Sequence, residues 1–152
     1  MKFSLDIGLK KKAEVVPENY HLGEDPQADL TLLLNECKLH LTKYDEKRIK
    51  RAFEICYKAH LNKLRKSGEP FYTHPLEVAR IVIKEIPLDE DSVIAALLHN
   101  VLDEGDFYTY EDLKKEFGPE VAQIVDGVSK IKYVESQHID SEAQAENCRR
   151  LL

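Results

Sequence analysis

Two histidines in apolar surroundings are the residues of this sequence whose type and spacing best suit chemistry. His74 and His99 lie 25 positions apart, and each belongs to a segment with helical periodicity. A helical bundle can therefore bring their imidazoles together, and imidazole nitrogens are common ligands of divalent metal ions. Lone histidines also cap helices or hydrogen-bond to carbonyls in a core, and their spacing alone favours this structural interpretation.

An acidic pair, Asp103 and Glu104, follows His99 after about one helical turn. Carboxylates in that place can position or deprotonate a water molecule. The alternative is an exposed helix end, but carboxylates at a helix C-terminus oppose the macrodipole, which favours the functional interpretation. Asn100 stands directly after His99, where an aspartate would complete a His-Asp pair.

A basic, glycine-containing loop precedes His74 and consists of Arg65, Lys66, Ser67 and Gly68. A guanidinium, an ammonium and a hydroxyl on a flexible backbone can bind phosphate, and arginine can also stack on a purine. The residues leave open the alternative of a solvated connection between helices. Together, the imidazoles, carboxylates and loop are what a metal-assisted phosphate hydrolase would assemble.

The other histidines and the cysteines lack such a context, and we assign them no chemistry. These histidines are His21, His40, His60 and His138. The three cysteines, Cys37, Cys56 and Cys148, are odd in number and show no CxxC spacing. This usage is typical of free thiols in a reducing cytoplasm.

Length and charge set the broad class. A chain of 152 residues predicts one domain, and a formal net charge of -6 argues against a general nucleic-acid binder. The longest apolar run, Val93 to Leu98, falls far short of the ~20 residues that span a bilayer, and no secretory signal is present. We expect a soluble, cytoplasmic protein that binds neither nucleic acid nor membrane.

Periodicity predicts an all-α fold, because no run of alternating strand residues occurs. Helices are expected over about 29–41, 45–64, 75–85, 89–104, 110–117 and 119–131, with a last helix from about 140. Asp45 and His74 are the expected N-caps of the second and third helices, and Arg48 is expected to be exposed. Residues 1–28 read as a leader that is poorly ordered or loosely docked.

Four blocks of the sequence resemble the N-terminal HD domain of RelA/SpoT-type (p)ppGpp synthetase/hydrolases. They read RKSGEPFYTHPLEVARIV, AALLHNVLDE, TYEDLKKEFGPEVAQIVDGVSKI and AQAENCRRLL, and they span residues 45–152 in the family's order. The resemblance implies an HD-domain helical bundle, with residues 29–152 as its N-terminal part and a truncation at its C-terminal end.

The resemblance also implies a function in the (p)ppGpp metabolism of the stringent response. In that family the HD domain removes the 3′-pyrophosphate of ppGpp and pppGpp with the help of manganese, and a following domain synthesises the alarmone from ATP and GDP or GTP. By motif, the metal positions are His74, His99 and Asn100. The catalytic pair is Asp103 and Glu104, in the reverse of the family's order, and the guanine-nucleotide loop is Arg65, Lys66 and Ser67.

Asn100 is the departure that matters most, because a neutral amide stands where the family has a metal-binding carboxylate. The family's last metal aspartate is expected beyond residue 152. The sequence therefore predicts the HD domain of a RelA/SpoT-like GTP pyrophosphokinase, deficient in hydrolysis and weak in Mn²⁺ binding. The alternatives are a working Mn²⁺-dependent hydrolase in the full-length chain and a non-catalytic guanine-nucleotide sensor that signals to the synthetase domain.

Overall fold

Helices account for all the regular secondary structure in the described part of the chain, which is residues 16–85 and 89–128 of a computed structural model. The all-α prediction is confirmed. The elements are α2 (Pro26–His40), α3 (Glu46–Ala59), α4 (Thr73–Glu85), α5 (Glu90–Leu98), the short 3₁₀ helix η1 (Val101–Asp103) and α6 (Tyr110–Phe117). Residues 119–128 are also helical, while the helix expected from about 140 lies outside the described residues.

Side chains that cap the helices set where they begin. Asp25, Asp45 and Asp89 each accept a hydrogen bond from a backbone N–H in the first turn of α2, α3 and α5. Thr109 and Asp112 form a reciprocal capping box at the start of α6. Such caps satisfy N–H groups that have no partner within the helix. The N-cap predicted at Asp45 is confirmed.

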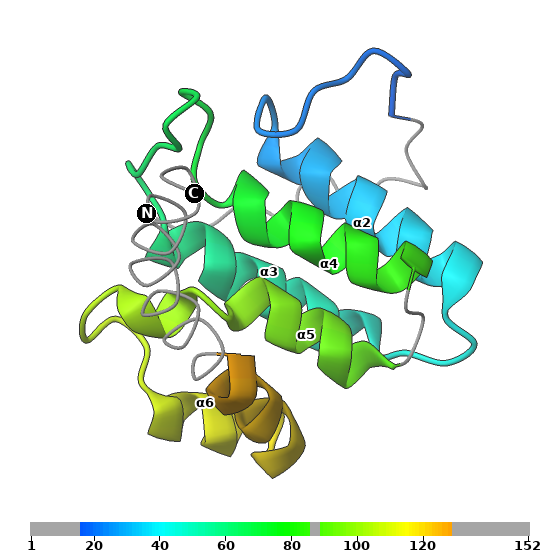
Figure 1. The fold of residues 1–152 in the computed structure, drawn as a ribbon. Helices are drawn as coiled ribbons and strands as arrows, with labels where there is room; N and C mark the ends of the chain where they lie inside the picture. Colours follow the sequence, from blue (N-terminus) through cyan, green and yellow to red (C-terminus); the bar gives the residue numbers. More distant parts are fainter. Residues whose placement is uncertain (1–15, 86–88, 129–152) are drawn as a thin grey trace, which may run out of the picture.

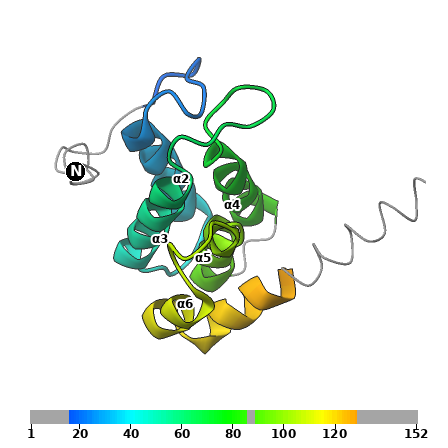
Figure 2. The same ribbon diagram turned by 90° about the vertical axis from the view of Figure 1, so that its left-hand side faces the viewer.

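Helix α4 lies between α2 and α5 and packs against both, while α3 contacts α2 and α5 from the other side (Figure 1). In the turned view, α6 and the helical residues 119–128 lie at one end of this group (Figure 2). Helices α2, α3, α4, α5 and α6 all contribute to the core. Its largest fully buried side chains include Leu30, Phe53, Leu76, Ile94, Leu97 and Leu113. Helix α4 is central, as its apolar sequence predicts, although Ile81 on its outer face is 56% exposed.

The segment that precedes α2 is anchored to the helix by a buried carboxylate. Asp29 is fully buried and accepts hydrogen bonds from the Tyr20 hydroxyl at 2.7 Å, the Tyr72 hydroxyl at 2.5 Å and the Gly23 N–H at 3.1 Å. Burial raises the pKa of Asp29, and these hydrogen bonds oppose the rise. Helix α2 begins at Pro26, three residues before the predicted start, because Asp25 caps it there. Residues 1–15 of the expected leader lie outside the described residues.

Helix α3 ends at Ala59, five residues before its predicted end. Two residues past its C-cap His60, Asn62 adopts a left-handed conformation with φ 65°, which a continuing α-helix does not permit. The chain then enters the basic loop. Because the helix ends early, the buried residue His60 is its C-cap.

Arg48 is not simply exposed, as the sequence predicted, but joins three elements. Its guanidinium pairs with Glu90, lies 3.1 Å from an Asp91 carboxylate oxygen and donates to the Phe117 carbonyl at 2.8 Å. The guanidinium also lies 5.9 Å from the centroid of the Phe117 ring. The forked shape of arginine lets one side chain tie the start of α3 to the start of α5 and the end of α6.

Replacing this arginine should destabilise the fold. Arg48→Met keeps an apolar stem but leaves Glu90 and Asp91 without their shared cation, and we expect a loss of about 1–3 kcal/mol in the free energy of unfolding. Urea denaturation monitored by circular dichroism measures the loss. The matched control is Lys50→Met, which breaks only the Lys50–Glu46 pair within α3 and should change stability by less than about 0.5 kcal/mol. Equal effects of the two substitutions would contradict the bridging role of Arg48.

Candidate functional site

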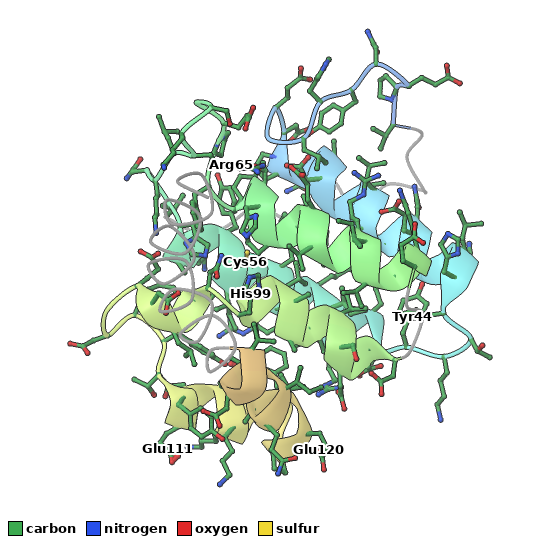
Figure 3. All side chains as sticks on the ribbon, in the orientation of Figure 1. Tyr44, Cys56, Arg65, His99, Glu111 and Glu120 are labelled. Atoms are coloured by element: carbon green, nitrogen blue, oxygen red, sulfur yellow. The ribbon has the colours of Figure 1, made fainter. Side chains whose placement is uncertain are left out.

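All of the predicted site residues line one cavity of about 810 Å³. Its lining comprises residues 63–67 of the basic loop, Phe71, His74, His99, Asn100, Asp103, Glu104 and Val128. In Figure 3, Arg65 comes from the loop before α4 and His99 from the C-terminal end of α5. Residues far apart in the sequence are thus brought to one end of the helical bundle.

His74 lies inside helix α4, so the prediction that it is an N-cap is wrong. The helix begins at Thr73, whose N–H donates to the Pro70 carbonyl at 3.2 Å, and the His74 N–H donates to the Phe71 carbonyl at 3.0 Å. Pro75 therefore lies in the first turn of the helix. Its lack of an N–H is tolerated there, because N–H groups of the first turn have no partner within the helix. The ring of His74 lies 5.8 Å from that of His99, between centroids.

The predicted helix over 89–104 is wrong beyond Leu98, where α5 ends. The chain continues as η1, in which the Asp103 N–H donates to the Asn100 carbonyl at 3.2 Å and the Glu104 N–H to the Val101 carbonyl at 3.1 Å. These i→i+3 hydrogen bonds wind the chain more tightly than an α-helix does. The acidic pair is therefore carried on a 3₁₀ turn, and both carboxylates line the cavity.

The tautomer of His99 follows from its surroundings. Its Nδ1 lies 2.5 Å from the carbonyl oxygen of Ala96, and a carbonyl can only accept a hydrogen bond. Nδ1 therefore carries the proton, so that in the neutral ring Nε2 holds the lone pair, as in many histidines that bind metals. His99 and the adjacent Asn100 are both buried, at 8% and 6% exposure.

The basic loop is held in a hairpin-like shape. The Phe71 N–H donates to the Lys63 carbonyl at 2.8 Å, and the Arg65 N–H donates to the Glu69 carbonyl at 2.7 Å. Gly68 closes the turn by donating to the Arg65 carbonyl at 2.9 Å, with φ 101° in the region that favours glycine. These hydrogen bonds fix the backbone that carries Arg65 and Lys66.

The side chains of this loop are paired with acidic residues. Arg65 donates to the Glu77 carboxylate at 2.7 Å, and the Ser67 hydroxyl donates to Glu69 at 2.6 Å. The Arg65 side chain is 29% exposed, so its guanidinium is oriented at the edge of the cavity and still accessible.

His60 lies beneath this site, a place that the sequence did not indicate. Its side chain is fully buried, neither ring nitrogen has a hydrogen-bond partner among residues 16–85 and 89–128, and Nδ1 lies 3.4 Å from Oε2 of Glu104. The ring packs on Phe71, with centroids 4.7 Å apart. The proximity of His60 to Glu104 arises from contact between α3 and η1, two elements that are far apart in the sequence.

The donor set of the cavity does not by itself fit a manganese site. Among the described residues, no group of three or more His, Cys, Asp and Glu side chains is placed to hold a metal ion. His74, His99 and Asn100 offer two imidazoles and a neutral amide, whereas Mn²⁺ is a hard ion that favours carboxylate and water oxygens. An aspartate at position 100 would supply the missing charge.

Comparison with known proteins defines the class. The profile of the HD domain family matches residues 52–152, and the chain belongs to this family. Its relatives assign it more closely, as an HD domain of the RelA/SpoT family. The recognition made from the four sequence blocks is thereby confirmed.

The names of the relatives include hydrolases and a pyrophosphokinase. A guanosine-3′,5′-bis(diphosphate) 3′-pyrophosphohydrolase of Aquifex aeolicus is 39% identical over 86% of this chain and 17% of its own length. A protein of the same name from Haemophilus influenzae is 48% identical over 64% of the chain and 14% of its own length. A GTP pyrophosphokinase of Myxococcus xanthus is 46% identical over 68% of the chain and 14% of its own length. The matched part of the chain thus spans only 14–17% of the length of these relatives.

The burial of His60 generates a pH-dependent contribution to stability. Desolvation lowers the pKa of His60 from 6.5 to about 4, against the attraction of Glu104. Between pH 4 and pH 6.5, His60 is protonated in the unfolded chain and neutral in the folded chain. The free energy of unfolding should therefore decrease as the pH falls from 6.5 to 4, by on the order of 3 kcal/mol.

Urea denaturation at several pH values measures this dependence. His60→Gln should remove this part of the slope, whatever its effect on absolute stability. His40→Gln removes an imidazole from an exposed position at the end of α2 and is the matched control. A slope that His60→Gln leaves unchanged would rule out the buried, neutral imidazole as its source.

Proposed function

We propose that this chain is the HD domain of a RelA/SpoT-like GTP pyrophosphokinase, that it binds ppGpp or pppGpp in the 810 Å³ cavity, and that Asn100 leaves it deficient in hydrolysis. The observation that carries the proposal is the single cavity in which the loop cations face the two histidines and the acidic pair. The parent protein would be cytoplasmic and would carry a synthetase domain after this one.

Nucleotide binding is supported by the loop at the cavity edge. Arg65 presents a planar guanidinium that can fork onto a phosphate or stack on guanine, and Lys66 adds a point charge. Ser67 adds a hydroxyl on the same pinned backbone. None of these contacts requires a metal ion, so binding can persist where catalysis fails.

Deficient hydrolysis is supported by the charges around the reacting groups. Asp103 and Glu104 line the cavity and could position a water molecule, but two carboxylates also repel an anionic pyrophosphate. A divalent cation would relieve this repulsion and polarise the phosphate, and the described donors hold such an ion poorly. Removal of the 3′-pyrophosphate should therefore be slow.

A second candidate function is a working Mn²⁺-dependent (p)ppGpp 3′-pyrophosphohydrolase. It is favoured by the retained imidazole pair, and it would require a carboxylate other than residue 100 to complete the metal site. The two candidates differ in how tightly the wild-type protein binds manganese.

Restoring the carboxylate at position 100 should strengthen metal binding. We expect Asn100→Asp to tighten the binding of Mn²⁺ at least about tenfold, because an anionic oxygen ligand replaces a neutral one. Isothermal titration calorimetry of the 152-residue chain measures the change. Asn35→Asp adds the same charge on α2, outside the cavity, and should leave Mn²⁺ binding as it is in the wild type. A wild-type protein that retains one Mn²⁺ per chain after dialysis would favour the second candidate instead.

Nucleotide binding should depend on Arg65. Titration of ppGpp, GDP and ATP without metal should show guanine-selective binding by the wild-type chain, and Arg65→Ala should weaken it by about ten- to a hundredfold. Arg51→Ala removes an arginine that pairs with Glu54 and Glu116, outside the cavity, and is the control. No binding by a wild-type chain shown by circular dichroism to be folded would refute the proposed function.

A further inference from the structure

Lys63 is a cation of the cavity that the sequence motifs did not single out. It lines the cavity together with Arg65 and Lys66, and its Nζ lies 2.5 Å from Oε2 of Glu104. Glu104 therefore pairs directly with this ammonium, although the two residues lie 41 positions apart in the sequence. The same carboxylate oxygen lies 3.4 Å from the buried ring of His60.

The ammonium of Lys63 is positioned by its surroundings. Its Nζ lies 4.2 Å from the centroid of the Phe71 ring, and the Lys63 carbonyl accepts the Phe71 N–H. Because Leu64 pairs with Pro70 in an isolated bridge and the Lys63 N–H donates to the His60 carbonyl at 3.2 Å, the backbone on both sides of Lys63 is held. The side chain is nevertheless 44% exposed, so a ligand in the cavity can reach it.

We propose that Lys63 is an additional phosphate-binding residue of this site and that Glu104 screens it until a nucleotide arrives. A phosphate group entering the cavity would take over the ammonium, and the ion pair with Glu104 would open. This inference rests on the proposed nucleotide binding and adds to it a residue and a specificity for highly charged, pyrophosphate-bearing nucleotides over those with fewer phosphates.

The exchange would replace a weak ion pair of Lys63 with stronger hydrogen bonds to phosphate. An ion pair with a half-exposed lysine is weak, because water screens the charges and ordering a long side chain opposes the pairing. A pyrophosphate carries more charge than a carboxylate and offers more acceptor oxygens, which strengthens hydrogen bonds from an ammonium. The freed Glu104 carboxylate has only the neutral imidazole of His60 beside it and repels the phosphate, so removing its charge should strengthen binding.

A double-mutant cycle on the 152-residue chain tests the exchange. The four proteins are the wild type, Lys63→Met, Glu104→Gln and the double variant, titrated without metal with ppGpp, GDP and inorganic pyrophosphate. Glu104→Gln should tighten ppGpp binding by about tenfold. Lys63→Met should weaken binding more strongly in the Glu104→Gln background than in the wild type, and it should remove most of that gain. The effect should be larger for ppGpp than for GDP.

Asp103→Asn is the matched control, because it removes a negative charge from the same cavity. Its effect on affinity should be the same with Lys63 and with Met at position 63. A gain from Glu104→Gln that survives intact in the Lys63→Met background would show simple charge repulsion and overturn this inference, while Arg65-dependent binding would leave the proposed function standing. Absence of binding in all variants would overturn both.

Discussion

The antiparallel packing of α4 against α5 is the constraint on which the site depends. The two helices are neighbours in the chain, joined around residues 86–89, and they pack along their lengths (Figure 1). The start of α4 therefore lies beside the end of α5, which brings the rings of His74 and His99 to 5.8 Å between centroids. Buried apolar residues such as Leu76, Ile83 and Leu97 hold this register. A shift of one turn, about 5.4 Å, would separate the two imidazoles.

Paired charges explain how a protein with a net charge of -6 could hold an anionic ligand. At the cavity, Lys63 is paired with Glu104 and Arg65 with Glu77. Each cation is thereby held in place by an acidic partner. In the proposed function, a phosphate would take the place of that partner.

Asn100 bears on the activity of this domain but not on its membership of the family. The relatives include proteins named as pyrophosphohydrolases and as a GTP pyrophosphokinase, at similar identity to this chain. Overall likeness therefore does not decide which chemistry this domain performs. A neutral amide beside His99 alters the charge available to a metal ion without altering the fold, since asparagine and aspartate have nearly the same shape.

The sequence by itself determined the fold class, most helix starts and the set of candidate site residues, which the structure gathers around one cavity. Local rules were sufficient there: Asp45 and Thr109 cap their helices, and the spacing of apolar residues marks the faces that are buried. Only the tertiary structure decided where α5 ends, that Arg48 joins three elements, and that His60 and Lys63 meet Glu104. These contacts connect residues more than 40 positions apart, and periodicity carries no information about which faces of different helices come together.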